Sequence, residues 1–246
     1  MKTYLITGGA SGIGLALSLD VHALGHQAVV LDQHARPEGL PVSVKYYRCD
    51  LSNIEQLKHT LNTIQSEGFM FDVLVHNAAT SKGGVLSATY DDFNHVMAVN
   101  VSAPFYLTQQ LLPQLKHQAS VVFIASTRAF QAQQDNEAYS ASKGAVISLM
   151  QALAVSLGGR VRVNAITPGW IDTTQQEMSK ADREQHPAKR VGTPQDIIQA
   201  IYFLSDPKQS FIQGANLVID GGMTKQMIYH ADEGWRYDPN PGLLED

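Results

Sequence analysis

Cysteine is nearly absent from this chain, because Cys49 is the only one among 246 residues. A single cysteine excludes an intrachain disulfide, and we expect it to pack as a small apolar side chain in a reducing compartment. Long apolar runs are also missing, so no membrane span is predicted. The first residues, "MKTYLITGG", lead directly into a strand pattern without the apolar region or cleavage site of a signal peptide. We therefore expect a soluble, cytoplasmic protein.

Blocks of basic residues are lacking as well. The chain has 18 Lys and Arg against 23 Asp and Glu, which gives a formal net charge of −5. Nucleic acid and anionic membranes are therefore not expected as partners, and no metal site is predicted. The composition, 44% hydrophobic and 17% charged, suits one large α/β domain with a full core.

Strand-like runs alternate with helix-like runs along most of the chain. The strand-like runs are continuous in Val, Ile and Leu, which is typical of a parallel sheet buried on both faces. The pattern predicts a single doubly wound, Rossmann-type α/β domain over residues 1–246, with a seven-stranded, mostly parallel sheet and helices on both faces. Strands are expected at Thr3–Thr7, Gln27–Asp32, Ser43–Asp50, Phe71–Asn77, Ala119–Ser126, Arg160–Ile166 and Ala215–Asp220, and the main helices at Gly14–Leu24, Asn53–Ser66, Asp91–Leu112 and Tyr139–Leu157.

A glycine-rich turn, "TGGASGIG", follows the first strand and places glycines at Gly8, Gly12 and Gly14. The spacing differs from the usual GxGxxG fingerprint, but the physics is the same. Glycine lets the backbone approach a phosphate, and the helix that starts here directs free N–H groups toward it. Ser11 could add a hydroxyl donor. A tight strand-to-helix turn without a ligand is the alternative.

Asp32 ends the second predicted strand, where a carboxylate can accept hydrogen bonds from the two hydroxyls of an adenine ribose. The same charge repels a 2′-phosphate, and position 11 holds Ser11 rather than a basic residue. Arg36 lies nearby in sequence and is expected to be solvated. The sequence therefore favours NAD over NADP, while the alternative for Asp32 is a turn-forming residue.

Tyr139 and Lys143 are four residues apart in the helical run "NEAYSASKGAV", so they share a helix face. Such a pair is ordinary by itself. However, Ser126 precedes Tyr139 by thirteen residues and ends a buried strand, and the carboxyl ends of parallel strands form a ligand crevice. Polar or turn residues follow five such ends, at Gly8, Asp32, Asn77, Ser126 and Pro168.

Taken together, these motifs resemble a short-chain dehydrogenase/reductase of the common type of about 250 residues. The resemblance covers Lys2 to about Thr224 and rests on "TGGASGIG", "CDL", "HNAA", "VNV", Ser126, "YSASK" and "PGWIDT", in order and at family spacing. The match departs from the family at His76 and Ala79, where a second asparagine and a final glycine are frequent. We expect His76 to be a packing residue.

The resemblance implies that Tyr139 is the catalytic acid/base, that Lys143 activates it and binds the cofactor ribose, and that Ser126 orients the substrate oxygen. Asn100 would hold a water of a proton relay through Lys143. A lysine charge about 4 Å away would stabilise the phenolate and bring the pKa of Tyr139 toward neutrality. Further NAD contacts are expected at Ile13, Asp50, Leu51, Asn77, Ala78, Ala79, Pro168, Gly169, Ile171 and Thr173.

Two polar segments, residues 127–137 and the lid 174–192, are expected to shape the substrate pocket. Arg128, Gln131, Gln133 and Gln134 lie in the first. Few bulky apolar residues line either segment, which favours a small polar alcohol or polyol over a steroid or long acyl chain. The alternative is that these polar side chains simply face water.

The predicted activity is the NAD-dependent interconversion of a secondary alcohol and a ketone. Two rivals stay open: an NADPH-dependent carbonyl reductase, and a non-catalytic Rossmann protein that senses NAD. Apolar helices around "FYLTQQLL" and "AVISLMQALAV" favour a homotetramer or homodimer. Residues 223–246 form a tail with Tyr229, Trp235 and Tyr237, which we expect to pack on the body or on a neighbouring subunit. The natural substrate and direction are not specified by the sequence.

Overall fold

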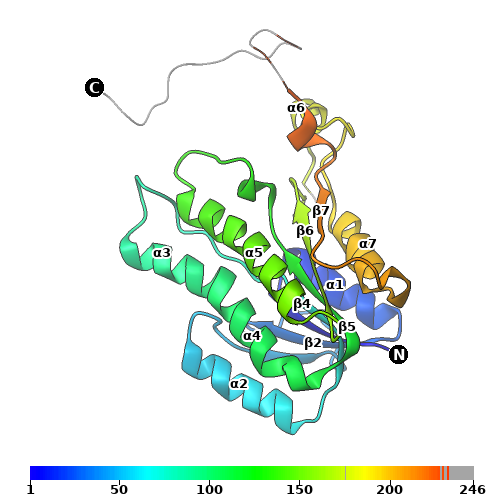
Figure 1. Ribbon diagram of the computed structural model, residues 1–246. Helices are drawn as coiled ribbons and strands as arrows, with labels where there is room; N and C mark the ends of the chain where they lie inside the picture. Colours follow the sequence, from blue (N-terminus) through cyan, green and yellow to red (C-terminus); the bar gives the residue numbers. More distant parts are fainter. Residues whose placement is uncertain (175, 228, 230–231, 233–246) are drawn as a thin grey trace.

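The computed structural model describes residues 1–174, 176–227, 229 and 232, and these fold around one sheet of seven strands (Figure 1). Every neighbouring pair is parallel, and the order is β3-β2-β1-β4-β5-β6-β7. The predicted fold class is confirmed. The strands are β1 (Thr3–Thr7), β2 (Gln27–Asp32), β3 (Lys45–Arg48), β4 (Phe71–His76), β5 (Leu115–Ile124), β6 (Arg162–Pro168) and β7 (Asn216–Ile219).

Alternate side chains of each strand enter two separate hydrophobic cores. Leu5 and Val29 point into the core that is covered by α2, α4 and α5, whereas Tyr4 and Val30 point into the core that is covered by α1 and α7 (Figure 1). Both faces of the sheet are therefore covered, as the continuous apolar runs predict. The helices are α1 (Gly12–Ala23), α2 (Ile54–Ser66), α3 (Tyr90–Met97), α4 (Ala103–Leu111), α5 (Glu137–Ser156), α6 (Lys180–Glu184) and α7 (Pro194–Ser205).

The long helix expected over Asp91–Leu112 is present but not α-helical throughout. A π-helical turn, η1 (Ala98–Ser102), joins α3 to α4. Such turns are rare and frequently occur at functional sites. Here the π-turn contains Asn100, which is only 2% exposed. Hydrophobic periodicity cannot distinguish a π-turn from an α-turn, so the sequence predicts only the helix.

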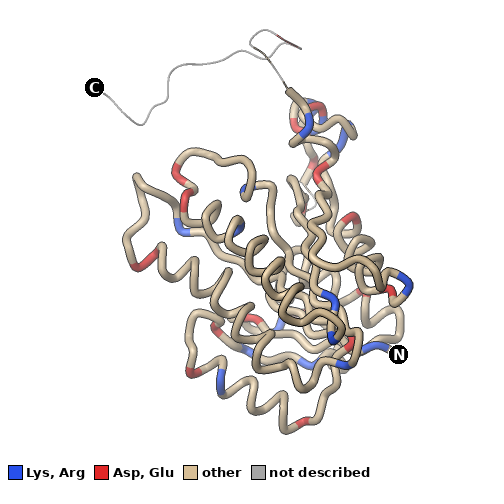
Figure 2. Tube along the Cα trace, in the orientation of Figure 1, with Lys and Arg blue, Asp and Glu red and all other residues tan. Residues whose placement is uncertain are grey.

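Charges of both signs are interspersed along the chain, and a mixed group surrounds α6 (Figure 2). In the described part of the chain, no helix combines the length and apolar character needed to cross a bilayer.

The last described segment follows β7 through a short 3-10 helix, η5 (Met223–Lys225). Beyond it, Met227 and Tyr229 are 76% and 68% exposed. The predicted packing of the tail over residues 223–246 depends mainly on Trp235 and Tyr237, which lie outside the described residues. That packing therefore stays a prediction.

Candidate active site

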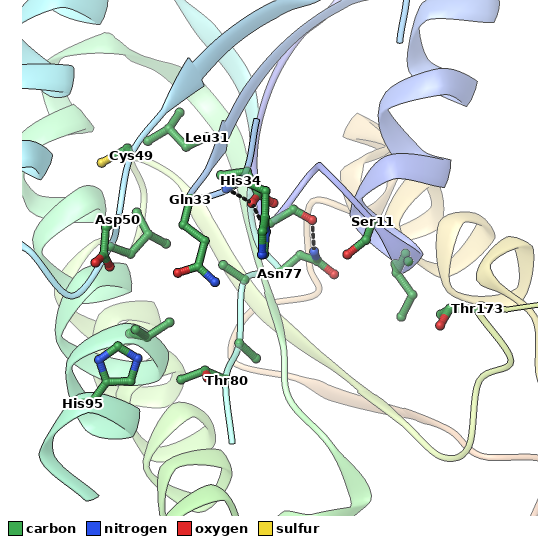
Figure 3. A pocket seen from close by; sticks show the side chains of 18 residues that line it. Ser11, Leu31, Gln33, His34, Cys49, Asp50, Asn77, Thr80, His95 and Thr173 are labelled. Carbon is green, nitrogen blue, oxygen red and sulfur yellow. Dashed lines mark hydrogen bonds and ion pairs between the residues drawn. The ribbon is translucent and has the colours of Figure 1, made fainter. Parts of the chain in front are cut away.

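The turn between β1 and α1 needs glycine because the protein packs tightly against itself there. Gly8 has a φ of +70°, and a Cβ on it would lie 2.7 Å from the Ala78 Cα. A Cβ on Gly14 would lie 2.0 Å from the carbonyl oxygen of Gly8. Asn77 closes the turn, since its Nδ2 donates to the carbonyls of Thr7 and Gly8 at 3.0 Å (Figure 3). Part of the glycine motif is thus explained by packing alone.

The start of α1 nevertheless fits an anionic ligand. Ser11 is the N-cap residue, and its side chain makes no capping hydrogen bond, so its hydroxyl is not used by the helix. The first N–H groups of a helix have no helical acceptors. Gly8, Ser11, Gly12 and Ile13 all line one pocket of about 260 Å³ (Figure 3). A phosphate group at this point would meet unused donors and the positive end of the helix dipole.

Asp32 lies at the end of β2 and lines the same pocket. Its carboxylate accepts hydrogen bonds from the backbone N–H groups of Ala10 and His34, each at 2.9 Å. The His34 ring also contacts it, with Nδ1 at 2.9 Å from Oδ1 (Figure 3). Sequence reasoning did not single out His34, although its place two residues after Asp32 could have suggested it.

Arg36 is exposed, as expected, but it is not simply solvated. Its guanidinium donates to the carbonyl oxygens of Val44 at 3.0 Å and Leu40 at 3.2 Å. The same group lies over the Tyr46 ring, 5.9 Å from its centroid. Arg36 is therefore held by its own loop. Arg48, which pairs with Asp32 across β2 and β3, donates from Nε to the carbonyl of Gln33 at 3.0 Å.

The far side of this pocket is formed by segments that follow β3 and β4. Asp50, Leu51, Asn77, Ala78 and Ala79 line it, as predicted. Cys49 is fully buried at its edge, in agreement with the predicted packing role, and burial raises the pKa of its thiol. The sequence analysis missed several other lining residues, namely Leu31, Gln33, His34, Thr80, His95 and Val99.

A second pocket, of about 320 Å³, is lined by three of the predicted catalytic residues, Ser126, Tyr139 and Lys143, whereas Asn100 lines neither pocket. It shares four lining residues with the first pocket, so the two adjoin: Ile13, Asn77, Ala79 and Thr173. Its other lining residues come from the ends of β5 and β6 and from α5: Ile124, Ala125, Ser126, Tyr139, Lys143, Pro168, Gly169, Trp170 and Ile171. The structure thus brings the predicted site residues of distant segments together. Trp170 was not predicted, although it lies inside the "PGWIDT" motif.

Lys143 is a buried cation beside Tyr139. Its Nζ donates to the carbonyl oxygen of Ile124 at 2.8 Å and lies 5.4 Å from the centroid of the Tyr139 ring. The residue is 2% exposed, and burial lowers the pKa of its ammonium group to about 8. A buried lysine without a carboxylate partner is costly, and such groups concentrate at functional sites.

The expected direction of the Tyr139 pKa is wrong in this structure. Burial raises the pKa of the phenol above its ordinary value, and this effect exceeds the opposing effects of the Ser126 hydrogen bond and the Arg128 charge. The Nζ of Lys143, 5.4 Å from the ring centroid, donates to the carbonyl of Ile124. The phenol is therefore protonated at neutral pH.

Ser126 and Asn100 both contact the N-terminal part of α5, at Tyr139 and at Ser142. The Ser126 side chain forms a hydrogen bond with Tyr139 and accepts another from the N–H of Arg128 at 3.2 Å. Asn100 Nδ2 donates to the carbonyl of Thr80 at 3.0 Å and to the Ser142 hydroxyl at 2.9 Å. Both amide protons of Asn100 are thus used within the protein, and its part in a proton relay stays a prediction.

His76 has the packing role that the sequence suggested. It is 3% exposed, its ring centroid lies 4.6 Å from that of Phe123, and its Nε2 is 2.8 Å from the Thr108 hydroxyl. Burial lowers its pKa to about 3, so the ring is neutral at physiological pH.

The two segments expected to shape the substrate pocket are largely exposed. In residues 127–137, the side chains of Gln131, Gln133 and Gln134 face solvent, while Arg128 is half-buried. In the described part of 174–192, His186 is the one fully buried polar residue, at 1% exposure. The alternative that most of these polar side chains face water is thus supported for this structure.

Comparison with known proteins assigns the family. A family profile described as enoyl-(acyl carrier protein) reductase matches residues 8–224. An uncharacterized oxidoreductase of Thermotoga maritima is 36% identical, over 93% of this chain and 98% of that protein. The chain belongs to the short-chain dehydrogenase/reductase family. Among its relatives is the 3-oxoacyl-[acyl-carrier-protein] reductase FabG of the same organism, 32% identical over 90% of this chain and 97% of that protein.

Solved structures agree with this assignment. An apo SCOR enzyme from Clostridium thermocellum has a TM-score of 0.89 and 37% identity, covering 96% of this chain and 98% of that one. A 4-hydroxyisoleucine dehydrogenase complexed with NADH has a TM-score of 0.85 and 30% identity, covering 92% of this chain and all of that one. As a short-chain dehydrogenase/reductase, the chain is an oxidoreductase of a family that uses nicotinamide cofactors, and the donors at Ser11 and α1 fit such a cofactor.

Proposed function

We propose that this short-chain dehydrogenase/reductase interconverts a secondary alcohol and a ketone with NAD as cofactor, and that Tyr139 is its acid/base. The observation that carries the proposal is the second pocket, where Ser126, Tyr139 and the buried Lys143 meet next to the pocket of Asp32. The first pocket offers hydrogen-bond donors to the phosphates of a cofactor, and the second offers a group that can transfer a proton. This combination suits hydride transfer between a nicotinamide and a substrate.

The reaction balances as ketone plus NADH plus a proton giving alcohol plus NAD. A bound nicotinamide supplies the hydride to the carbonyl carbon. Tyr139 gives its phenolic proton to the carbonyl oxygen, and the hydroxyl of Ser126 donates to the same oxygen and stabilises its developing charge. Lys143 places a positive charge beside the phenolate that is left. Because burial keeps the phenol protonated, the enzyme is poised to act as the acid of carbonyl reduction.

The preference for NAD rests on Asp32. A ribose with a free 2′-hydroxyl can donate to this carboxylate, whereas a 2′-phosphate would meet its negative charge. Arg36 is occupied by carbonyls of residues 40 and 44, so it is not placed to neutralise such a phosphate. The similarity to a dehydrogenase that was solved with NADH points the same way.

A second candidate is an NADPH-dependent reductase of the 3-oxoacyl type. The similarity to FabG and to the enoyl-(acyl carrier protein) reductase profile favours it. Against it, Met178 and Val191 are the only larger apolar side chains in the described part of 174–192. They provide little apolar surface to line a site for a long acyl chain. We therefore propose a small polar substrate, in line with the similarity to 4-hydroxyisoleucine dehydrogenase.

We further propose that the enzyme is a cytoplasmic homotetramer or homodimer. Cys49 is a buried free thiol, which suits a reducing compartment. Phe105 on α4 is 46% exposed and Val155 on α5 is 84% exposed. The two helices cover the same side of the sheet (Figure 1). A dimer through these helices would cover both. Light scattering at micromolar concentration checks this, and a monomer mass would refute it. Phe105→Glu should shift the mass toward the monomer if α4 is in the interface.

The test of the proposed function is the substitution Tyr139→Phe. We expect turnover of any good substrate to fall about 10²- to 10⁴-fold, the range of general acid–base catalysis, with unchanged affinity for NADH. Tyr90→Phe, at a tyrosine 80% exposed on α3, is the matched control and should leave both quantities unchanged. Substantial oxidation or reduction by the Tyr139→Phe enzyme would refute the role of Tyr139.

A further inference from the structure

Arg128 is a half-buried residue two positions after Ser126, which lines the catalytic pocket. Arg128 belongs to the 3-10 helix η3 (Thr127–Ala129), which packs against α5, the helix that carries Tyr139. Its backbone N–H donates to the Ser126 hydroxyl oxygen at 3.2 Å. The backbone of Arg128 is thus hydrogen-bonded to the Ser126 hydroxyl, which in turn forms a hydrogen bond with Tyr139. Its charge also acts at the phenol, where it lowers the pKa of Tyr139 against the larger effect of burial.

No protein group in the described part of the chain forms a side-chain hydrogen bond or ion pair with Arg128. The carboxylates nearest along the loop are used elsewhere. Asp135 accepts from the N–H of Leu86 at 2.9 Å and from the Ser87 hydroxyl, and Glu137 accepts from the N–H of Val85 at 2.8 Å. These bonds fasten the end of the 127–137 loop to residues 85–87, and they leave the guanidinium at its start without an anion.

The charges around Tyr139 are also of one sign. Among the described residues that line the catalytic pocket, Lys143 is charged and positive, and no Asp or Glu is present. Arg128 adds a second positive charge that acts on Tyr139. Two positive charges without a carboxylate attract an anion, and a guanidinium binds a carboxylate through two parallel hydrogen bonds.

We propose that the substrate carries an anionic group, such as the carboxylate of a hydroxy or oxo acid, and that Arg128 binds it. This inference rests on the proposed function and deepens it, because it names the substrate class of the same site. Arg128 would orient the substrate by its anion, while Ser126 and Tyr139 hold the oxygen that reacts.

The experiment uses 3-oxobutanoate and 4-oxopentanoate, each beside its methyl ester, with the NADH-loaded enzyme. Reduction is followed by NADH absorbance, and binding of the same four compounds is measured by calorimetry. We expect at least one acid to be preferred over its ester. In Arg128→Met, the acid-to-ester ratio of kcat/KM should fall roughly 10- to 100-fold, mainly through KM, because a hydrogen-bonded charge pair is lost. Arg128→Lys should retain part of the preference. Lys208→Met, at an exposed lysine of the 3-10 helix η4 (Pro207–Gln209), should retain all of it.

Each outcome decides one of the two proposals. If the ketones are reduced but the acid has no advantage over its ester, or keeps its advantage in Arg128→Met, then Arg128 is not an anion receptor, and the proposed function stands. If nothing is reduced, calorimetry still decides: an acid that binds better than its ester only when Arg128 is present supports the inference. Equal or absent binding of acid and ester overturns it. Retained NADH affinity shows that each variant is folded.

Discussion

The cofactor end of this site and its substrate end are held in different ways. Asp32 and Asn77 stand at or next to the carboxyl ends of β2 and β4, and their positions follow from a parallel sheet with two buried faces. The loop 127–137 and the lid 174–192 instead reach beyond the sheet and are placed by contacts with other segments. Asp135 and Glu137 anchor the loop. The described part of the lid is held by the ion pair of Arg190 with Asp196, by the hydrogen bond from the N–H of Ala188 to the carbonyl of Gly221, and by the bridge between Ile171 and Gly192.

This difference teaches which part of the function a sequence can reveal. A residue at a strand end is placed by the strand, so a short motif fixes its surroundings. A loop residue is placed by contacts with segments that are distant in sequence, as Asp135 is by Leu86, so its neighbours cannot be read from a short motif. We therefore expect cofactor recognition to belong to the first region and substrate choice to the second.

The largest effect is expected from removing Lys143, whose charge we expect to act at both the cofactor end and the substrate end of the site. Lys143→Ala should lower kcat about 10²- to 10³-fold and also weaken NADH binding, because the buried ammonium group lies beside the phenol in the pocket that adjoins the first one. Steady-state kinetics and NADH fluorescence measure the two quantities. Lys58→Ala, at an exposed lysine paired with Glu55, is the control. Loss of rate with full NADH affinity would show that Lys143 acts at one end only.

A smaller and more selective effect is expected at the strand-end region. Asp32→Ala should weaken NADH binding roughly 10- to 100-fold, the range for hydrogen bonds to a charged group, and should relax the rejection of NADPH. The affinity for substrate should hardly change, since Asp32 lines only the first pocket. Titration of both cofactors checks this. An unmodified enzyme that binds NADPH more tightly than NADH would contradict the role of Asp32, whatever the variant does.

The smallest effect is expected in the loop region. Asp135→Ala removes the bonds to Leu86 and Ser87, each worth about 0.5–1.5 kcal/mol net, and loosens the end of the 127–137 loop. We expect KM for the substrate to rise about 3- to 10-fold, with an unchanged dissociation constant for NADH. Asp91→Ala, at an exposed aspartate of α3, is the matched control. A weaker NADH complex in Asp135→Ala would show that the two regions are not independent.

Much of the fold can be predicted from the sequence, because the hydrophobic pattern of each segment matches the residues that the structure buries. The runs at Thr3–Thr7 and Gln27–Asp32 are strands with the predicted bounds, and the glycine turn joins β1 to α1. The π-turn at Asn100 could not be predicted, because its apolar pattern is that of an α-helix. The edge strand β3 is shorter than expected, at Lys45–Arg48, since only one neighbour supports it.

Most residues that line the site could be predicted from the sequence, whereas their hydrogen bonds and pKa shifts could not. The structure brings Ser126, Tyr139 and Lys143 into one pocket, as expected. The acceptor of Lys143 is the carbonyl of Ile124, nineteen residues away, and no motif encodes that contact. The raised pKa of Tyr139 likewise depends on burial by several segments at once.

The most direct test of the account is an absorbance assay of the unmodified enzyme with NADH and a panel of ketones, and with NAD and the matching alcohols, alongside NADH binding by fluorescence. The account predicts that NADH binds and that at least one small ketone of the panel is reduced, faster with NADH than with NADPH at equal concentration. Tight NADH binding without turnover of any member would contradict it, and would favour a protein that binds the cofactor without catalysing a reaction.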